Sequence, residues 1–142
     1  MNIYYLSLTI TVLSNIFYHI TQKSINTNVN PIASIIATYI IALMASLILY
    51  LFYPANTNFI TSFTSLNWAS YALGITIIGV ELGYLLAYRS GWQLNMTAIT
   101  TTILVTLLLV PIGLMYFHEK LTIQKMLGIF LGIISLILIN LK

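Results

Sequence analysis

Five apolar stretches, each long enough to cross a lipid bilayer, follow one another along the chain with only short connections between them. A bilayer core of about 30 Å requires roughly 20 mostly apolar residues per helix. Because backbone polar groups find no water in that core, each stretch is expected to be helical. The sequence therefore predicts an all-α bundle of about five transmembrane helices in one transmembrane domain, residues 1–142, with spans at residues 3–22, 31–52, 67–88, 94–117 and 122–141.

The shortage of charged side chains supports the same prediction. Of the 142 residues, 60% are hydrophobic and only 5% are charged, whereas a soluble domain has roughly 25% charged residues. The chain has no cysteine, which excludes disulfides, thiolate metal sites and cysteine nucleophiles. The first apolar stretch lacks the basic start and the cleavage site of a signal peptide, so we expect it to be retained. We expect a multi-pass protein of the cell inner (plasma) membrane.

Positive charges are divided almost evenly between the two sides of a five-helix chain. Lys23, Arg89 and Lys142 fall on one side, and Lys120 and Lys125 fall on the other. An excess of Lys and Arg normally fixes which loops stay in the cytoplasm, so three charges against two give little bias. Two interpretations stay open: two antiparallel copies that form the halves of an inverted repeat, or one orientation that is fixed by a partner protein.

Glu81 gives the strongest indication of function in the sequence. It lies inside the third predicted span, eight residues or about 12 Å before Arg89. A charge at this depth is costly, so an acid in a span marks a functional site that faces the protein interior. Such a carboxyl group can exchange a proton for a cationic substrate. The alternative is a protonated Glu81 that holds helices together through a hydrogen bond to a Ser, Thr or Asn.

Aromatic residues share the face of the third span on which Glu81 lies. Helical spacing places Gly74, Glu81, Tyr84 and Tyr88 on that face. Tyrosine rings beside a carboxylate attract an organic cation through charge and cation–π contact. Tyr88 also fits an interfacial anchor, because it precedes Arg89 near the end of the span. We predict that Glu81, Tyr84 and Tyr88 bind the substrate and the proton.

The first span carries a polar stripe opposite an apolar face. The members of this stripe are Tyr4, Ser7, Thr11, Ser14, Asn15, Tyr18 and Gln22. In lipid, a polar stripe faces other helices or a water-filled cavity, so a lined pathway and simple helix packing both explain it. We include Asn15 and Tyr18 in the predicted substrate site. For His19, off the centre of the stripe, we favour a solvated interfacial residue over a proton relay to Glu81.

The last two spans contain a proline and a pattern of small residues. Pro111 is expected to kink the fourth span. In the fifth span, Gly128, Gly132 and Ser135 lie on one face and let two helix backbones approach closely, which predicts helix packing or dimerisation. The sequence holds no metal-ligand cluster, phosphate-binding glycine loop or nucleophile elbow, so we expect no metal, no cofactor and no enzymatic activity. A dispersed net charge of +3 does not predict nucleic acid binding.

A short motif connects the fourth and fifth spans. Residues 117–122 read Phe-His-Glu-Lys-Leu-Thr and are followed by Gln124, Lys125, Leu127, Gly128 and Gly132. This pattern resembles the end of an EamA-like unit of the drug/metabolite transporter superfamily, and a looser similarity extends back through residues 83–89 to about Gly74. The resemblance implies a five-helix unit that normally occurs twice per transporter in inverted orientation. It also implies that Glu119 is a structural residue that caps the helix or pairs with Lys120 or Lys125.

These features together predict a class of function. We expect a secondary transporter of a small organic cation, amine or metabolite, coupled to protons. The resemblance implies a single-repeat form that is related to small multidrug resistance-type transporters. The resemblance implies that it works in the lipid bilayer as an antiparallel homodimer or as a heterodimer of paralogues. The alternative hypotheses are a non-transporting membrane subunit or assembly partner, and a lipid or isoprenoid-carrier flippase.

Overall fold

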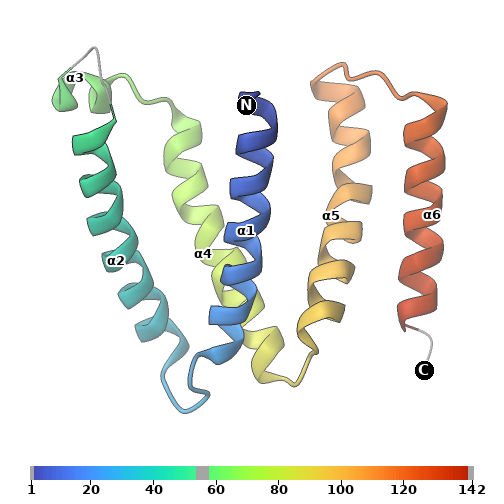
Figure 1. The fold of residues 1–142 in the computed structure, drawn as a ribbon, viewed down its shortest axis with the longest axis horizontal. Coiled ribbons are helices and arrows are strands. Elements are labelled where there is room, and N and C mark those ends of the chain that lie inside the picture. Colours follow the sequence, from blue (N-terminus) through green and yellow to red (C-terminus); the bar gives the residue numbers. More distant parts are fainter. Residues whose placement is uncertain (1, 54–57, 141–142) are drawn as a thin grey trace. The chain divides into compact units, whose positions relative to one another are not determined.

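The computed structural model describes residues 2–53 and 58–140, and these residues form helices without any β-strand (Figure 1). The predicted all-α fold is therefore confirmed. A short helix precedes the third long helix, and the elements in chain order are α1 (Ile3–Ser24), α2 (Pro31–Phe52), α3 (Phe59–Thr64), α4 (Trp68–Arg89), α5 (Leu94–Tyr116) and α6 (Ile123–Asn140).

Four of these helices, α1, α2, α4 and α5, are long and apolar enough to cross a membrane. Each begins and ends within two residues of its predicted span. The four helices indicate a multi-pass membrane protein. Helix α6 is also apolar, but its apolar stretch, Ile123–Ile139, is shorter, so the predicted fifth span is not confirmed. Residue 141 of that predicted span lies outside the described residues.

Asparagine side chains fix where two of the long helices begin. Oδ1 of Asn30 accepts a hydrogen bond of 2.8 Å from the backbone N–H of Ile32, and Pro31 occupies the first helical position of α2. Asn67 accepts a bond of 3.1 Å from the N–H of Ala69 at the start of α4. Both arrangements satisfy backbone N–H groups that have no partner inside the helix, and proline has no N–H to satisfy. The Asn-rich connections thus define the start of the next span.

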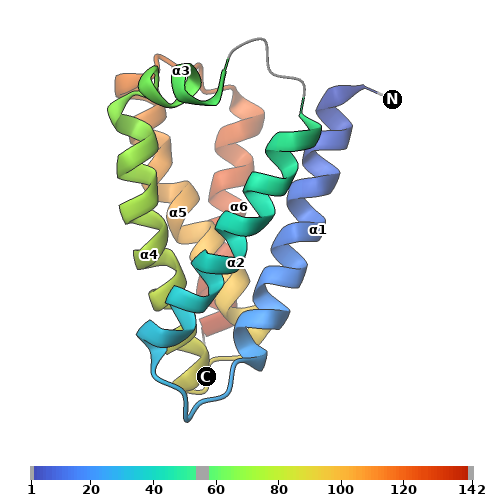
Figure 2. The same cartoon turned by 90° about the vertical axis from the view of Figure 1, so that its left-hand side faces the viewer.

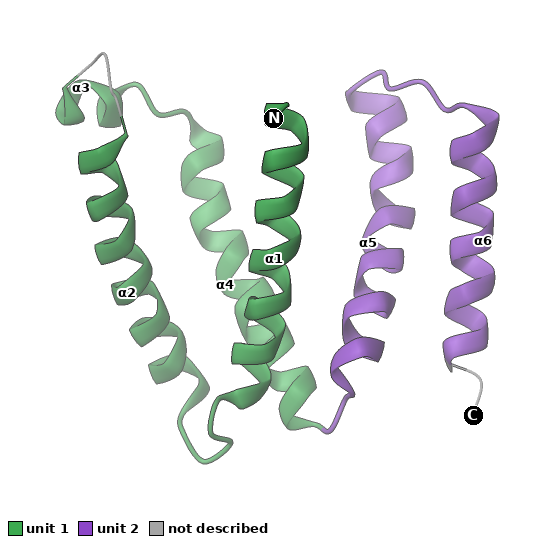
Figure 3. Cartoon of the chain, viewed as in Figure 1, with its two compact units in different colours: residues 1–90 green, residues 91–142 purple. Residues whose placement is uncertain are grey.

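The described chain divides into two compact units, residues 1–90 and 91–142 (Figure 3). In the first unit, α4 packs against both α1 and α2. The short α3 runs across the direction of α2 and α4 (Figure 2). In the second unit, α5 packs against α6. The prediction that residues 1–142 form one domain stays a prediction.

The connection between the second and third spans contains α3, which the sequence pattern did not predict. The ring of Phe59 packs edge-on against Tyr50 of α2, with 5.1 Å between centroids. Ile60 and Phe63 remain largely exposed, at 75% and 55%. An apolar exposed surface on a short helix that lies across the spans fits the membrane–water interface. Residues 54–57, with Pro54, lie outside the described residues.

Polar side chains make up most of the buried residues, and large apolar side chains face outward. Ile41 and Leu49 of α2, for example, are 65% and 67% exposed. This distribution fits helices that turn apolar side chains to lipid and polar side chains to each other. The buried apolar residues are Ile35, Leu85 and Tyr88, and the buried polar residues are His19, Gln22, Glu81, Thr97 and Thr100.

The connection between α4 and α5 turns at Gly91, which has a φ of +95°. Glycine adopts this backbone conformation without the steric cost that a Cβ atom imposes. Replacing Gly91 by Ala is therefore expected to lower the free energy of unfolding by more than about 1 kcal/mol, measured by denaturant titration in detergent micelles.

The matched control for this prediction is Gly79→Ala in α4. Gly79 is exposed, and a Cβ atom built on it meets no other atom within 4 Å. Alanine at this helical position should leave stability unchanged or raise it slightly. Equal losses in the two variants would contradict a special role for the Gly91 turn.

Candidate functional site

The carboxyl group of Glu81 is held between two helices in the first unit. Glu81 lies on α4 and is only 8% exposed. Its Oε2 atom accepts a hydrogen bond from Nε2 of Gln22, which lies in the last turns of α1 and is also buried. A buried carboxyl group without a partner would be costly, so this contact fixes how α1 meets α4. The sequence analysis placed Gln22 on the polar stripe but did not identify it as the partner of Glu81.

Aromatic side chains of α1 and α4 pack together beside this hydrogen bond. The rings of Tyr18 and Tyr84 meet edge to face, with 5.7 Å between centroids, and the His19 ring lies 4.8 Å from that of Tyr84. The hydroxyl group of Tyr88 forms a hydrogen bond of 2.7 Å with Nδ1 of His19. Edge-to-face packing of this kind stabilises aromatic pairs beyond their buried area. Glu81, Tyr84, Tyr88 and Tyr18 thus lie at one interface between α1 and α4. That they bind a substrate and a proton stays a prediction.

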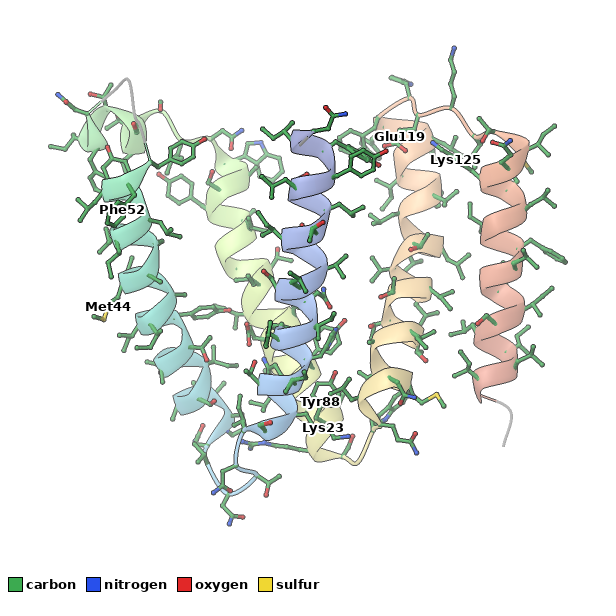
Figure 4. All side chains as sticks on the ribbon, viewed as in Figure 1. Lys23, Met44, Phe52, Tyr88, Glu119 and Lys125 are labelled. Atoms are coloured by element: carbon green, nitrogen blue, oxygen red, sulfur yellow. The ribbon has the colours of Figure 1, made fainter. Side chains whose placement is uncertain are left out.

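His19 and Tyr88 lie deeper than their positions in the sequence suggested. His19 is 6% exposed, so the expectation of a solvated interfacial histidine is wrong, because α4 covers this face of α1. Tyr88 is 8% exposed and packs inward. The Nζ atom of Lys23 lies 5.9 Å from the centre of the Tyr88 ring, within range of a cation–π contact (Figure 4).

Asn15 is not part of this cluster. It lies one turn before Tyr18 and His19 on α1, and its side chain is exposed. Gly74 is likewise exposed, seven residues before Glu81 on α4, and a Cβ atom there would meet nothing within 4 Å. The close contacts of α1 with α4 involve residues 18–23 of α1. Both residues therefore share a helical face with the cluster but lie beyond its contacts.

A pocket of about 420 Å³ extends along Glu81 between α1, α2 and α4. Ile25 and Ser34 line it near the α1–α2 connection, and Glu81 and Ile41 line it deeper in the unit. Seven residues separate Ser34 from Ile41, which corresponds to about 10 Å of helix. Tyr18 and Gln22 line the same pocket, whereas Tyr84 and Tyr88 do not. The pocket therefore connects one end of the helices with the buried carboxyl group.

The small residues predicted for helix packing lie in the second unit. Gly128 and Gly132 of α6 line a groove of about 430 Å³ together with residues of α5. A Cβ atom on Gly132 would lie 3.8 Å from Cγ2 of Ile103, and Ser135 is partly exposed on the same helix. The glycines of α6 thus face a helix of the same chain. Whether Gly128, Gly132 and Ser135 also serve dimerisation stays a prediction.

Glu119 of the connecting motif packs against the end of α5. Its backbone N–H donates a hydrogen bond of 3.0 Å to the carbonyl of Gly113, and its Oε2 atom would lie 3.2 Å from a Cβ atom at that glycine. Lys125 lies near it at the same end of the unit (Figure 4). No ion pair with Lys120 or Lys125 is formed in this described segment. Glu119 therefore contacts Gly113 at the end of α5 and does not form the expected pair with Lys120 or Lys125.

Comparisons with known proteins identify no relative of this chain. No protein-family model matches the chain, and neither a curated protein nor a solved structure matches it significantly. The resemblance of residues 117–132 to an EamA-like unit therefore stays a prediction.

The hydrogen bond between Gln22 and Glu81 can be tested by a double-mutant cycle. Gln22→Ala removes the donor and leaves the carboxyl group buried, so stability should fall by on the order of 1 kcal/mol, measured by denaturant titration in detergent. Glu81→Ala gives the second arm of the cycle. The double variant should lose less than the sum of the two single losses, and strict additivity would show that the bond contributes nothing.

Proposed function

We propose that the chain is one half of a proton-coupled secondary transporter for a small organic cation or amine. The observation that carries the proposal is the carboxyl group of Glu81, buried within a helix of membrane-spanning length and lining a pocket. Ionisable groups inside spans are expensive and mark substrate and ion pathways. A pocket of about 420 Å³ is at the lower end of the range for small-molecule sites, which favours a small substrate.

The pocket supports access to Glu81 from one side of the membrane. Its lining begins at the α1–α2 connection, where Arg89 also donates a hydrogen bond of 3.2 Å to the carbonyl of Asn26. Alternating access requires that a site opens to one side at a time. A cation that enters from this end would reach Glu81 and displace its proton, and reprotonation would release the cation. In this mechanism Glu81 couples the movement of the cation to the movement of protons in the opposite direction.

We further propose that two antiparallel copies, or two paralogues, form the complete transporter. The chain has few positive charges to fix its orientation. Lys23 and Arg89 belong to the same end of the first unit, as expected, because Arg89 contacts the α1–α2 connection next to Lys23. Lys142 lies outside the described residues. In this proposal the chain has five spans, and α6 is the fifth. The proposal also places the chain among the EamA-like units that its motif at residues 117–122 resembles.

A non-transporting subunit is the second candidate function. The bond between Gln22 and Glu81 favours it, because it satisfies the buried acid and joins two helices without any substrate. In that case Glu81 serves only to hold the helices together. The two candidate functions predict different effects on proton transport when Glu81 is replaced by a neutral side chain of the same shape.

Glu81→Gln tests the transport proposal directly. The amide keeps the size of the side chain but cannot release a proton, so proton efflux in response to external organic cations should be abolished. The measurement uses proteoliposomes that contain a pH-sensitive dye. Glu119→Gln, at the other acid of the chain, is the matched control and should retain proton efflux. Unchanged efflux with Glu81→Gln would exclude the proposed coupling and favour the structural subunit.

Single cysteines test the antiparallel arrangement. The chain has no cysteine of its own, so Ser24→Cys and Thr122→Cys each introduce a unique label site. With dual insertion, a membrane-impermeant thiol reagent should label a fraction of each site from either side of the membrane. Labelling of each site from one side alone would mean a single orientation, and a partner protein would have to supply the other half.

A further inference from the structure

The groove of the second unit, about 430 Å³ between α5 and α6, is apolar over most of its length. Leu107, Val110 and Ile129 are among the side chains that line it. Thr106 also lines it, but its hydroxyl group donates a hydrogen bond of 2.8 Å to the carbonyl of Thr102 on the same helix. A threonine hydroxyl has one donor, so this bond leaves no unpaired O–H for a ligand. The middle of the groove therefore suits an apolar ligand.

The missing side chain of Gly128 keeps the groove open on the α6 side. A Cβ atom built on Gly128 meets no other atom within 4 Å. One turn further along α6, a Cβ atom on Gly132 would lie 3.8 Å from Cγ2 of Ile103. Helix α6 thus has an α5 side chain in ordinary contact range at Gly132 and free space beside Gly128.

The groove extends along α5 over about the depth of one lipid leaflet. Leu114 and Thr102 are its outermost lining residues on this helix, and they are twelve residues apart, which corresponds to about 18 Å. One leaflet is half of a bilayer core of about 30 Å. Because α5 is long and apolar enough to cross the membrane, an acyl chain in the groove would reach the middle of the bilayer.

Charged side chains gather at the end of the groove next to the α5–α6 connection, which we call its mouth. Glu119, Lys120 and Lys125 line the mouth, and Figure 4 shows Glu119 and Lys125 at the same end of the two helices. Two positive charges and one negative charge give the mouth a net charge of +1. Neither lysine forms an ion pair with a described residue, since the Glu119 side chain lies against Gly113. The mouth therefore suits a ligand with one negative charge.

We propose that the groove binds an anionic phospholipid, with one acyl chain between α5 and α6 and its phosphate group at Lys120 and Lys125. Basic residues beside pockets between membrane helices bind anionic head groups in this way. The acyl chain fills the space beside Gly128, and the phosphate group supplies the negative charge. A free phosphate ion would leave the apolar part unfilled. The site lies in the second unit and does not depend on the transport function proposed for Glu81.

The first test compares two lipids that have the same acyl chains. Dioleoylphosphatidylglycerol carries one negative charge, and dioleoylphosphatidylcholine has no net charge. Each lipid is titrated into the full, unmodified chain in detergent micelles, and bound lipid is measured by native mass spectrometry. The phosphatidylglycerol should bind about tenfold more tightly, because each lysine near the head group attracts an anionic lipid. Equal affinities would overturn the proposal.

Lys125→Gln then assigns this preference to the mouth of the groove. It removes one of the two positive charges, so the affinity for phosphatidylglycerol should fall several-fold while that for phosphatidylcholine stays unchanged. Lys125→Arg is the matched control, since it keeps the charge and binds phosphate equally well, and it should retain the preference. An affinity that does not change with Lys125→Gln would show that the head group lies elsewhere.

Gly128→Leu tests whether an acyl chain occupies the groove. Leucine favours a helix and fills the space beside α6 without changing any charge, so the affinity for phosphatidylglycerol should fall several-fold. Gly79→Leu on α4 is the matched control. A Cβ atom there also meets nothing within 4 Å, but Gly79 lines neither the groove nor the pocket at Glu81, so lipid affinity should not change.

Two further results would overturn the proposed lipid. The first is binding of phosphatidylglycerol that persists with Gly128→Leu and is displaced by glycerol 1-phosphate, the head group without acyl chains. The lysines would then bind a phosphate group while the groove holds no acyl chain. The second is a chain that is dimeric in micelles and becomes monomeric with Gly128→Leu, because a second copy would then cover the groove.

Discussion

The absence of water from the bilayer interior is the constraint on which the rest of this structure depends. It forces the backbone into helices, because only there are the N–H and C=O groups paired within one segment. It applies equally to side chains, so Glu81 requires a partner and finds one in Gln22. The contact between α1 and α4 in the first unit follows from that requirement. In a soluble protein, burial of apolar surface would bring the same two helices together. Between helices in lipid, the same burial gives no hydrophobic driving force.

The helices could be predicted from sequence because the thickness of the membrane sets their length. Apolar runs of about 20 residues bounded by Asn, Pro or charged residues gave four helices to within two residues. The six-residue α3 could not be predicted in this way, because it is too short to show a helical period and mixes Phe and Ile with Thr and Ser. Helix α6 shows the opposite limit, since its composition is apolar but its described part is shorter than a standard span.

The site could be predicted in part, because spacing identifies a helical face but not the neighbour that covers it. Glu81, Tyr84 and Tyr88 share a face of α4, and the structure places that face against α1. Spacing did not show where along α1 the contact occurs, so Asn15 was included and Gln22 was not. The position of His19 off the centre of the polar stripe predicts a solvated residue, whereas α4 buries it.

The scarcity of buried apolar residues has a consequence for how this chain can change. Ile35, Leu85 and Tyr88 are the buried apolar side chains of the described residues, while many apolar side chains of α2 and α5 are exposed. A lipid-facing position accepts Leu, Ile, Val or Phe with little effect, since acyl chains adapt to any apolar shape. Substitutions will therefore accumulate over most of the helical surface, and the positions that resist exchange will be the few polar ones between α1, α2 and α4. In such a protein the residues that change least are the hydrophilic ones.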